Sequence, residues 1–154
     1  MIISTPQLRL IFSIFYIGID ILYVNTAKNI YNESVIKIQK EPMPDYSKNI
    51  DRLLSAVAAW SCMIIGWAFL AAPMAEKWTD GNYFFSPFIA GAAVGLIYGL
   101  LLIGTYNFTL HAMFINYDKI IMFKDLSWGI SWSIIITSLY AYVYYKSKNM
   151  KSII

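Results

Sequence analysis

Four long apolar stretches dominate the sequence and constrain its fold more than any other feature. They cover residues 8–24, 53–72, 87–108 and 126–145. A helix needs about 20 consecutive apolar residues to cross the hydrocarbon core of a bilayer, and each stretch is close to that length. The sequence therefore predicts an all-α fold, a bundle of four transmembrane helices that forms a single membrane domain over residues 1–154.

The composition agrees with lipid as the main solvent. Charged residues make up 14% of the chain and hydrophobic residues 58%, whereas soluble domains carry about 25% charged residues. The net charge of +3 is small and is spread over loops and the tail. A lipid bilayer is therefore the expected partner, and nucleic acid is not. The lone cysteine, Cys62, cannot form an internal disulfide.

The first stretch carries the weakest signal, because Arg9 lies at its edge and Asp20 inside it. Two features of this stretch argue against a cleaved secretory signal: its leader has one basic residue, and Asp20 interrupts its apolar core. We therefore interpret the first stretch as a retained span. The sequence then predicts a long loop over residues 25–52. Apolar residues between Tyr31 and Ile38 recur at helical spacing, which leaves a short helix on the membrane surface and a solvated loop as equal alternatives.

Small residues recur at every fourth position in the second and third stretches. The second stretch carries Ala58, Cys62 and Gly66, and the third carries Gly91, Gly95 and Gly99. Such stripes let helix backbones approach closely in lipid. We expect close packing within the subunit, with a homo-oligomer surface as the alternative. Pro73 is expected to end the second span.

Four crossings would place the ends of the first and third spans and the starts of the second and fourth on one membrane face. The polar residues near the membrane gather at that face: Asp20, Tyr23, Arg52, Thr105, Tyr106, Asn107, His111, Asp125 and Trp128. The opposite helix ends are expected to be mainly aromatic and aliphatic, as in an interfacial belt. The side of the membrane that the cluster faces stays open, since cations are divided almost evenly between the two faces.

Asp20 stands out within this cluster. A carboxylate inside a transmembrane helix costs roughly a few kcal/mol unless it is protonated, paired or hydrated. Arg52, Tyr106 and Asn107 are its candidate partners. A site for a proton, an ion or a solute and a structural clasp between helices are equal alternatives. Asp125 is instead expected to cap the fourth span.

The sequence offers little support for enzymatic chemistry. His111 has no second histidine with which to bind a metal. There is no phosphate-binding glycine loop, no zinc cluster and no serine nucleophile in a recognisable context. We therefore predict no catalytic residue, no metal and no cofactor. An interfacial enzyme acting on lipid is the weakest alternative, and it would use Asp20, Tyr106, Asp125 and His111.

The segment GTYNFTLHAMFINYDKIIMFKDLSWG, from Gly104 to Gly129, resembles the domain-of-unknown-function 2177 family of small predicted membrane proteins, found in bacteria and large DNA viruses. That family's pattern reads G-T-Y-D-L-T-N and, after a spacer, V-D-x-x-W-G. The matching positions are Gly104, Thr105, Tyr106, Thr109, Asp125, Trp128 and Gly129. The family's aspartate in the first span and its proline after the second correspond to Asp20 and Pro73.

The chain departs from that pattern at two positions. Asn107 stands where the family has aspartate, and Leu110 stands where it has asparagine. If the family's function requires an ionised carboxylate at the first position, Asp20 would have to supply it here. An amide would still preserve the hydrogen bonding of a clasp. The resemblance implies a four-span membrane fold and marks the polar cluster, but it implies no known activity.

These patterns leave three functions for a multi-pass membrane protein. In the first, the protein is not an enzyme, and the cluster handles a proton, an ion or a small polar solute. In the second, the protein has a structural or interaction role in a cellular or viral membrane, and the cluster only holds helices together. The interfacial enzyme is the third.

Overall fold

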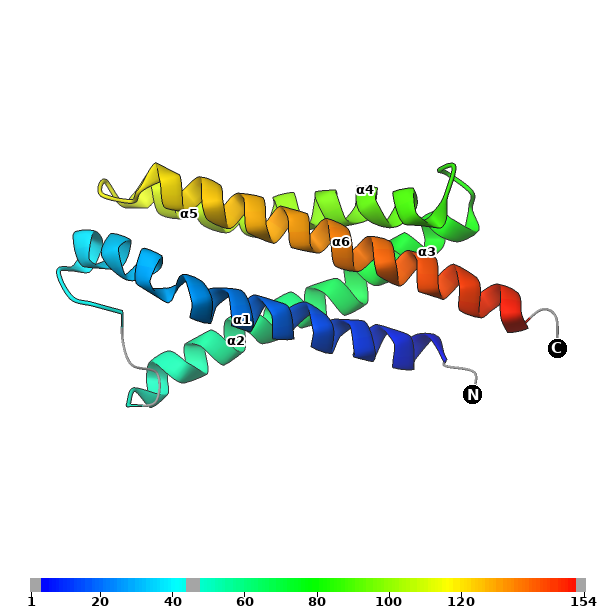
Figure 1. The fold of residues 1–154 in the computed structure, drawn as a ribbon, viewed down its shortest axis with the longest axis horizontal. Coiled ribbons are helices and arrows are strands. Elements are labelled where there is room, and N and C mark those ends of the chain that lie inside the picture. The colour runs from blue at the N-terminus through cyan, green and yellow to red at the C-terminus, as the bar shows by residue number, and fades with distance from the viewer. Residues whose placement is uncertain (1–3, 44–47, 152–154) are drawn as a thin grey trace.

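The computed structural model describes residues 4–43 and 48–151, which form four long helices and no strand within those ranges (Figure 1). The first long helix is α1 (Thr5–Gln39) and the fourth is α6 (Lys119–Lys151). The second long helix consists of α2 (Ile50–Gly66), the π-helical turn η1 (Trp67–Ala71) and α3 (Ala72–Asp80). The third consists of α4 (Pro87–Gly99), the π-helical turn η2 (Leu100–Gly104) and α5 (Thr105–Met113). All four are long and apolar enough to cross a membrane. The predicted all-α membrane bundle is confirmed.

α1 is longer than the first apolar stretch, and it corrects the loop predicted over residues 25–52. The helix begins with a capping box at Ser4. It continues because no glycine or proline interrupts residues 19–39. Lys40 then adopts a left-handed conformation with φ of 65°, and Pro42 prevents the helix from resuming. Most of the expected loop is thus the second half of α1.

Pro73 lies inside the second long helix and does not end it, contrary to the prediction. Proline lacks the N–H that an α-helix needs, and its ring clashes with the preceding turn. Here the helix widens just before the proline into the π-helical turn η1, where the Ala72 N–H bonds to the Trp67 carbonyl. Pro73 then occupies the first turn of α3, where a missing N–H is tolerated.

α6 starts at Lys119, well before the predicted residue 126. Asp118 precedes the helix, and its carboxylate accepts a hydrogen bond from the Ile120 N–H at 2.8 Å. Asp125 therefore lies inside α6, and the capping role expected for it is wrong. The residue that caps this helix is Asp118.

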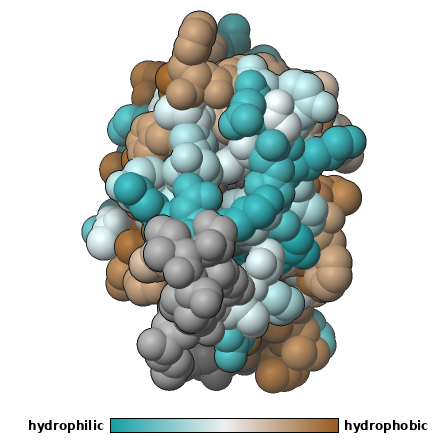
Figure 2. All heavy atoms as spheres, turned by 90° about the vertical axis from the view of Figure 1, so that its right-hand side faces the viewer, coloured by the Kyte–Doolittle hydropathy of each residue, from teal (hydrophilic) through white to brown (hydrophobic). Residues whose placement is uncertain are grey.

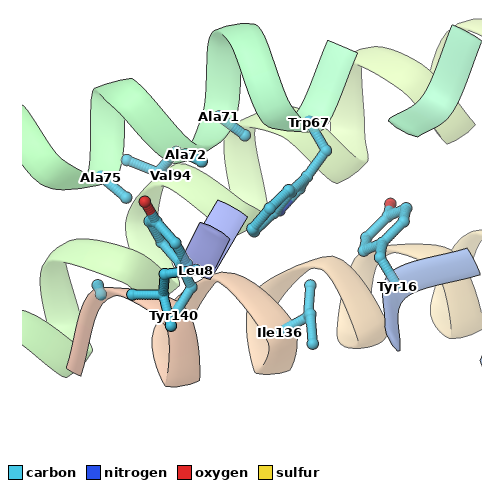
Figure 3. Close-up of a cluster of buried hydrophobic side chains, with 10 residues drawn as sticks. Leu8, Tyr16, Trp67, Ala71, Ala72, Ala75, Val94, Ile136 and Tyr140 are labelled. Atoms are coloured by element: carbon cyan, nitrogen blue, oxygen red, sulfur yellow. The ribbon is translucent and has the colours of Figure 1, made fainter. Parts of the chain in front are cut away.

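One end of the bundle, which we term the closed end, holds the start of α1, the end of α6 and the turn between α3 and α4 (Figure 1). Its core joins side chains from all four long helices: Leu8, Tyr16, Trp67, Ala71, Ala72, Ala75, Val94, Ile136, Tyr140 and Ala141 (Figure 3). Trp67 and Tyr140 meet edge to face with ring centroids 5.2 Å apart. The Trp67 indole N–H donates to Thr137 Oγ1 at 3.0 Å. Aromatic rings whose polar atoms are bonded thus fill this end.

Glycines let α4 lie directly against α6. Gly91, Gly95 and Gly99 all face that helix. At Gly95, an added Cβ would lie 2.3 Å from the Ser133 carbonyl oxygen and 2.7 Å from Ile134 Cα. Backbone atoms cannot move aside as a flexible side chain can, so only glycine permits this approach. The small-residue stripe of the third span therefore packs within the subunit.

The corresponding stripe of the second span does not. Ala58 and Cys62 are exposed, and no residue of α2 is buried. Only Gly66 approaches another helix, where an added Cβ would lie 2.9 Å from the Tyr98 hydroxyl. α2 diverges from α5 with distance from the closed end (Figure 1). The close packing within the subunit expected at Ala58 and Cys62 is therefore wrong, and the alternative of a homo-oligomer surface stays a prediction.

The outer surface suits a bilayer. Large apolar side chains point away from the bundle along its length, among them Phe69, which is 72% exposed, and Leu101, which is 67% exposed. At the closed end, polar residues gather on the end face between apolar flanks (Figure 2). Apolar sides with a polar end are the surface pattern of a helix bundle that crosses a membrane.

Candidate functional site

The other end of the bundle, which we term the open end, holds the end of α1, the start of α2 and the turn between α5 and α6 (Figure 1). It contains a cleft of about 930 Å³. The polar lining includes Asp20, Tyr31, Arg52, Trp60, Tyr106 and Asp125, and the apolar lining includes Met63, Leu102, Ile103 and Leu110. The cleft forms because α2 diverges from α5, while the glycines hold α4 against α6.

Asp20 lies near the middle of α1 and is held by two indole groups. Its Oδ2 accepts a hydrogen bond from the Trp60 Nε1–H at 3.1 Å, and its Oδ1 accepts one from the Trp128 Nε1–H at 3.4 Å. Both donors are neutral. Within the described residues, Asp20 forms no ion pair. Its charge is thus oriented by N–H dipoles but is not neutralised.

Asp125 of α6 is held in a similar way. Its Oδ1 accepts a hydrogen bond from the Tyr31 hydroxyl at 2.6 Å, and its Oδ2 accepts one from Asn107 Nδ2 at 2.6 Å. No cation in the described part of the chain forms an ion pair with this carboxylate either. Through these bonds, one carboxylate ties α1 and α5 to α6.

Asn107 is fully buried, and both ends of its amide are bonded. Its Nδ2 also donates to the Ile103 carbonyl at 3.1 Å, and its Oδ1 accepts from the Tyr117 hydroxyl at 2.9 Å. Burial raises the pKa of Tyr117 to about 12, so this phenol keeps its proton and stays a donor at neutral pH. The sequence had suggested Asp20 as the partner of Asn107. In the structure the Asn107 side chain is bonded to Asp125 instead.

Aromatic contacts connect the two carboxylates. Tyr23 stacks on Trp128 with ring centroids 4.2 Å apart and an interplanar angle of 8°. Its hydroxyl lies 3.2 Å from that of Tyr31. Since Trp128 bonds Asp20 and Tyr31 bonds Asp125, one network contains five predicted residues: Asp20, Tyr23, Asn107, Asp125 and Trp128.

The other predicted cluster residues have different surroundings. Arg52 lines the cleft but is exposed, and the ion pair expected between Arg52 and Asp20 is wrong. Tyr106 also lines the cleft and is exposed. Thr105 is exposed, and His111 is half-buried, but neither is among the lining residues.

Several lining residues were missed in the sequence. Trp60 and Tyr31 carry no local signal of a polar role, because their polar atoms meet the carboxylates only when the helices pack. Ser34 is a further case. It lines the cleft, is 4% exposed, and its Oγ has no hydrogen-bond partner among the described residues. A buried hydroxyl without a partner is costly.

The closed end also holds a charged cluster, although it was expected to be mainly aromatic and aliphatic. Arg9 Nε and Nη2 donate to the two carboxylate oxygens of Glu76 at 2.7 and 2.6 Å. The Tyr140 hydroxyl donates to the same carboxylate. The Glu76 charge is therefore balanced by a bidentate ion pair.

In the described part of the chain, no group of three or more His, Cys, Asp and Glu side chains could hold a metal ion. No family model, no curated protein and no solved structure matches the chain. The function of the site therefore has to be inferred from its own geometry.

Proposed function

We propose that this multi-pass membrane protein takes up a cation, whether a proton, an inorganic ion or an organic cation, in the cleft at its open end. Asp20 and Asp125 are the acidic groups held by other helices at the site, and Glu41 also lines the cleft. The observation that carries the proposal is that both carboxylates line one cleft and accept hydrogen bonds from neutral donors, while within the described residues Arg52, which also lines the cleft, forms an ion pair with neither. The role requires no chemical step on the ligand.

A carboxylate in a medium of low dielectric constant needs a proton or a counter-charge. Neutral N–H and O–H donors orient the carboxylate but leave its net charge. At the closed end, Arg9 supplies the counter-charge for Glu76. At the open end, no cation within the described residues does so for Asp20 or Asp125. A cation from the aqueous phase would complete the balance.

The support around Asp125 favours a preorganised site. The buried Asn107 and the hydroxyl of Tyr31 hold this carboxylate from two helices, which limits its movement before a ligand binds. Both Asn107 and Asp125 lie in the segment from Gly104 to Gly129 that resembles the domain-of-unknown-function 2177 family. We propose membership of that family on this resemblance.

Cys62 allows a direct test, because it is exposed and lines the cleft. The reconstituted protein is treated with two water-soluble methanethiosulfonates of similar size, one carrying a trimethylammonium group and the other a sulfonate. Charged reagents of this kind react with a thiolate in water and not with a thiol in hydrocarbon. After correction for their rates with a free thiol, we expect the cationic reagent to react about tenfold faster, since an acidic cleft concentrates cations.

Matched variants identify the source of this preference. Asp20→Asn and Asp125→Asn should each reduce it, whereas Asp51→Asn, at an exposed position outside the cleft lining, should not. Cys62→Ser gives the background. Reaction from one side of the membrane only would identify the side that the cleft faces. Equal rates with the two reagents, or no reaction with either in a folded protein, would overturn the proposal.

A structural clasp is the second candidate, and the complete burial of Asn107 favours it. Its hydrogen bonds to Asp125 and Tyr117 join separate segments of the open end. Asp125→Asn separates the two candidates. A clasp alone would show no reagent preference at Cys62 in the wild type and would lose stability in this variant, whereas a cation site would show the preference in the wild type and lose it in the variant.

A further inference from the structure

We infer that the cation taken up in the cleft is an organic cation with an apolar body, and not an inorganic ion. This inference rests on the proposed function and specifies its substrate class. It follows from the size of the cleft, from the ligands that the cleft offers and from the chemistry of its walls.

The cleft is far larger than a bare ion requires. Its volume of about 930 Å³ lies in the range of roughly 300–1,000 Å³ that is typical of sites for drug-sized molecules. A dehydrated inorganic cation would occupy a small fraction of this space. The size therefore favours a ligand with many non-hydrogen atoms.

The carboxylates do not form a coordination cage. Calcium takes about 6–8 oxygen ligands, and magnesium requires a nearly ideal octahedron of oxygens. Asp20 and Asp125 each already accept two hydrogen bonds from protein groups, and the described residues contain no metal-binding group of three acidic, histidine or cysteine side chains. An organic ammonium needs fewer ligands, because charge attraction and one or two acceptors suffice.

The remaining walls are apolar and aromatic. Met63, Leu102, Ile103, Leu110 and Ile121 line the cleft together with the two carboxylates. A hydrated inorganic ion gains nothing from these side chains, whereas an apolar body is removed from water against them. The Trp60 ring also lines the cleft, and its N–H bond to Asp20 places an aromatic ring next to the acidic group. Such rings attract organic cations.

Ser34 is a further polar residue beside the cleft. Its Oγ is buried and has no hydrogen-bond partner within the described residues, although the residue lines the cleft. A hydroxyl can accept as well as donate. The Ser34 side chain would have to turn toward the cleft to receive a ligand N–H, because its Oγ is not accessible as it stands.

The test uses probes that separate charge from apolar size. Tetraphenylphosphonium is a bulky apolar cation, tetraphenylborate is an anion of nearly the same size and shape, and tetramethylammonium carries the charge without the apolar body. Binding to the full chain in lipid nanodiscs is measured by calorimetry against empty nanodiscs, and by protection of Cys62 from a neutral maleimide. We expect tetraphenylphosphonium to bind about tenfold tighter than either of the other probes.

Two pairs of variants assign the binding to the cleft. Ala58 and Ala59 are both exposed on α2, but only Ala59 lines the cleft. Ala59→Phe should weaken tetraphenylphosphonium binding by about tenfold because the ring occupies the space, and Ala58→Phe should leave it unchanged. Asp20→Asn should weaken binding, and Asp51→Asn should not. Because both alanines are exposed, neither substitution is expected to disturb folding. A difference in binding between the two variants therefore reports on the cleft.

The possible outcomes distinguish a failure of this inference from a failure of the proposed function on which it rests. If Cys62 prefers the cationic reagent but tetraphenylphosphonium binds no tighter than tetramethylammonium, the site takes a small cation and the inference fails alone. If tetraphenylphosphonium and tetraphenylborate bind equally, apolar partitioning explains the signal and the inference also fails. If Cys62 is unreactive and no probe binds, both ideas fail together.

Discussion

The two ends of the bundle place carboxylates in opposite electrostatic situations. At the closed end, Glu76 receives both arms of the Arg9 guanidinium at 2.7 and 2.6 Å and lies beside a packed aromatic core. At the open end, Asp20 and Asp125 receive only neutral donors and line a cleft of about 930 Å³. The closed end balances the charge of Glu76 within the protein, whereas no ion pair in the described part of the chain balances Asp20 or Asp125.

The comparison shows that the role of an acidic residue in a membrane helix depends on its partners. The two ends also differ in how tightly their side chains are packed. Tyr140 is completely buried at the closed end, whereas α2 contributes no buried residue to the open end. Stability should therefore be concentrated at the closed end, and ligand binding at the open end.

The largest effect on stability is expected from Glu76→Gln. The substitution leaves the Arg9 guanidinium, which is 28% exposed, without its counter-charge. Because this pair is only partly buried, removing one partner is expected to cost up to about 3 kcal/mol, the lower limit for a fully buried pair. Unfolding in mixed micelles would measure the loss. The double variant Arg9→Met with Glu76→Met should recover part of it, and additive losses in the double variant would show that the pair is not coupled.

Gly95→Ala should have the next largest effect. The added Cβ would lie 2.3 Å from the Ser133 carbonyl oxygen, so α4 and α6 must separate. Overpacking of this kind costs about 1–3 kcal/mol. Gly18→Ala is the matched control, because nothing lies within 4 Å of a Cβ there. The same unfolding assay should show no loss for Gly18→Ala, and equal losses at the two positions would contradict the close approach of these helices.

Asp20→Asn should cost less than either. The substitution removes a charge that has no cationic partner and sacrifices at most one of the bonds from Trp60 and Trp128. Hydrogen bonds between membrane helices contribute about 0.6 kcal/mol on average. The variant should thus stay close to wild type in unfolding while losing cation preference at Cys62. A loss as large as that of Glu76→Gln would mean that Asp20 is a structural group.

The smallest effect concerns pH and Asp118, in the turn before α6. The Ile120 N–H, and to a smaller extent Lys37, hold the pKa of this carboxyl below its usual range. A pKa lowered in the folded state means that the carboxylate contributes stability above its unfolded pKa of about 4. That contribution is lost as the pH falls through the folded pKa. Asp118→Asn should show a shallower decrease in stability below about pH 4, and identical pH profiles would contradict this.

Local sequence patterns predicted the helices well and their limits poorly. The glycines at positions 91, 95 and 99 indicated a close helix contact, and α4 lies against α6 there. The same reasoning failed at Ala58 and Cys62, since a stripe of small residues permits close packing but does not decide which helix approaches. The second span was predicted to end at Pro73, because hydropathy does not reveal the π-helical turn that accommodates this proline. A loop was predicted after Val24, because hydropathy does not reveal that α1 continues as a polar helix.

The polar cluster was predicted as a region, but its bonds were not. Counting four crossings brought Asp20, Asn107 and Asp125 to one end of the bundle. The pairing of Asn107 with Asp125, and of Asp20 with Trp60, depends on helix rotation and tilt. A change of one position around a helix would select other partners, so no local pattern encodes these contacts.

The sequence by itself determined the solvent, the number of spans and the all-helical fold. Apolar segments of this length are stable in a bilayer only when each satisfies its own backbone hydrogen bonds. The tertiary structure alone decided that Arg9 neutralises Glu76 and that Asp20 and Asp125 line an open cleft. These side chains lie far apart in the chain, and their distances are set by how α2 diverges and how α4 and α6 close.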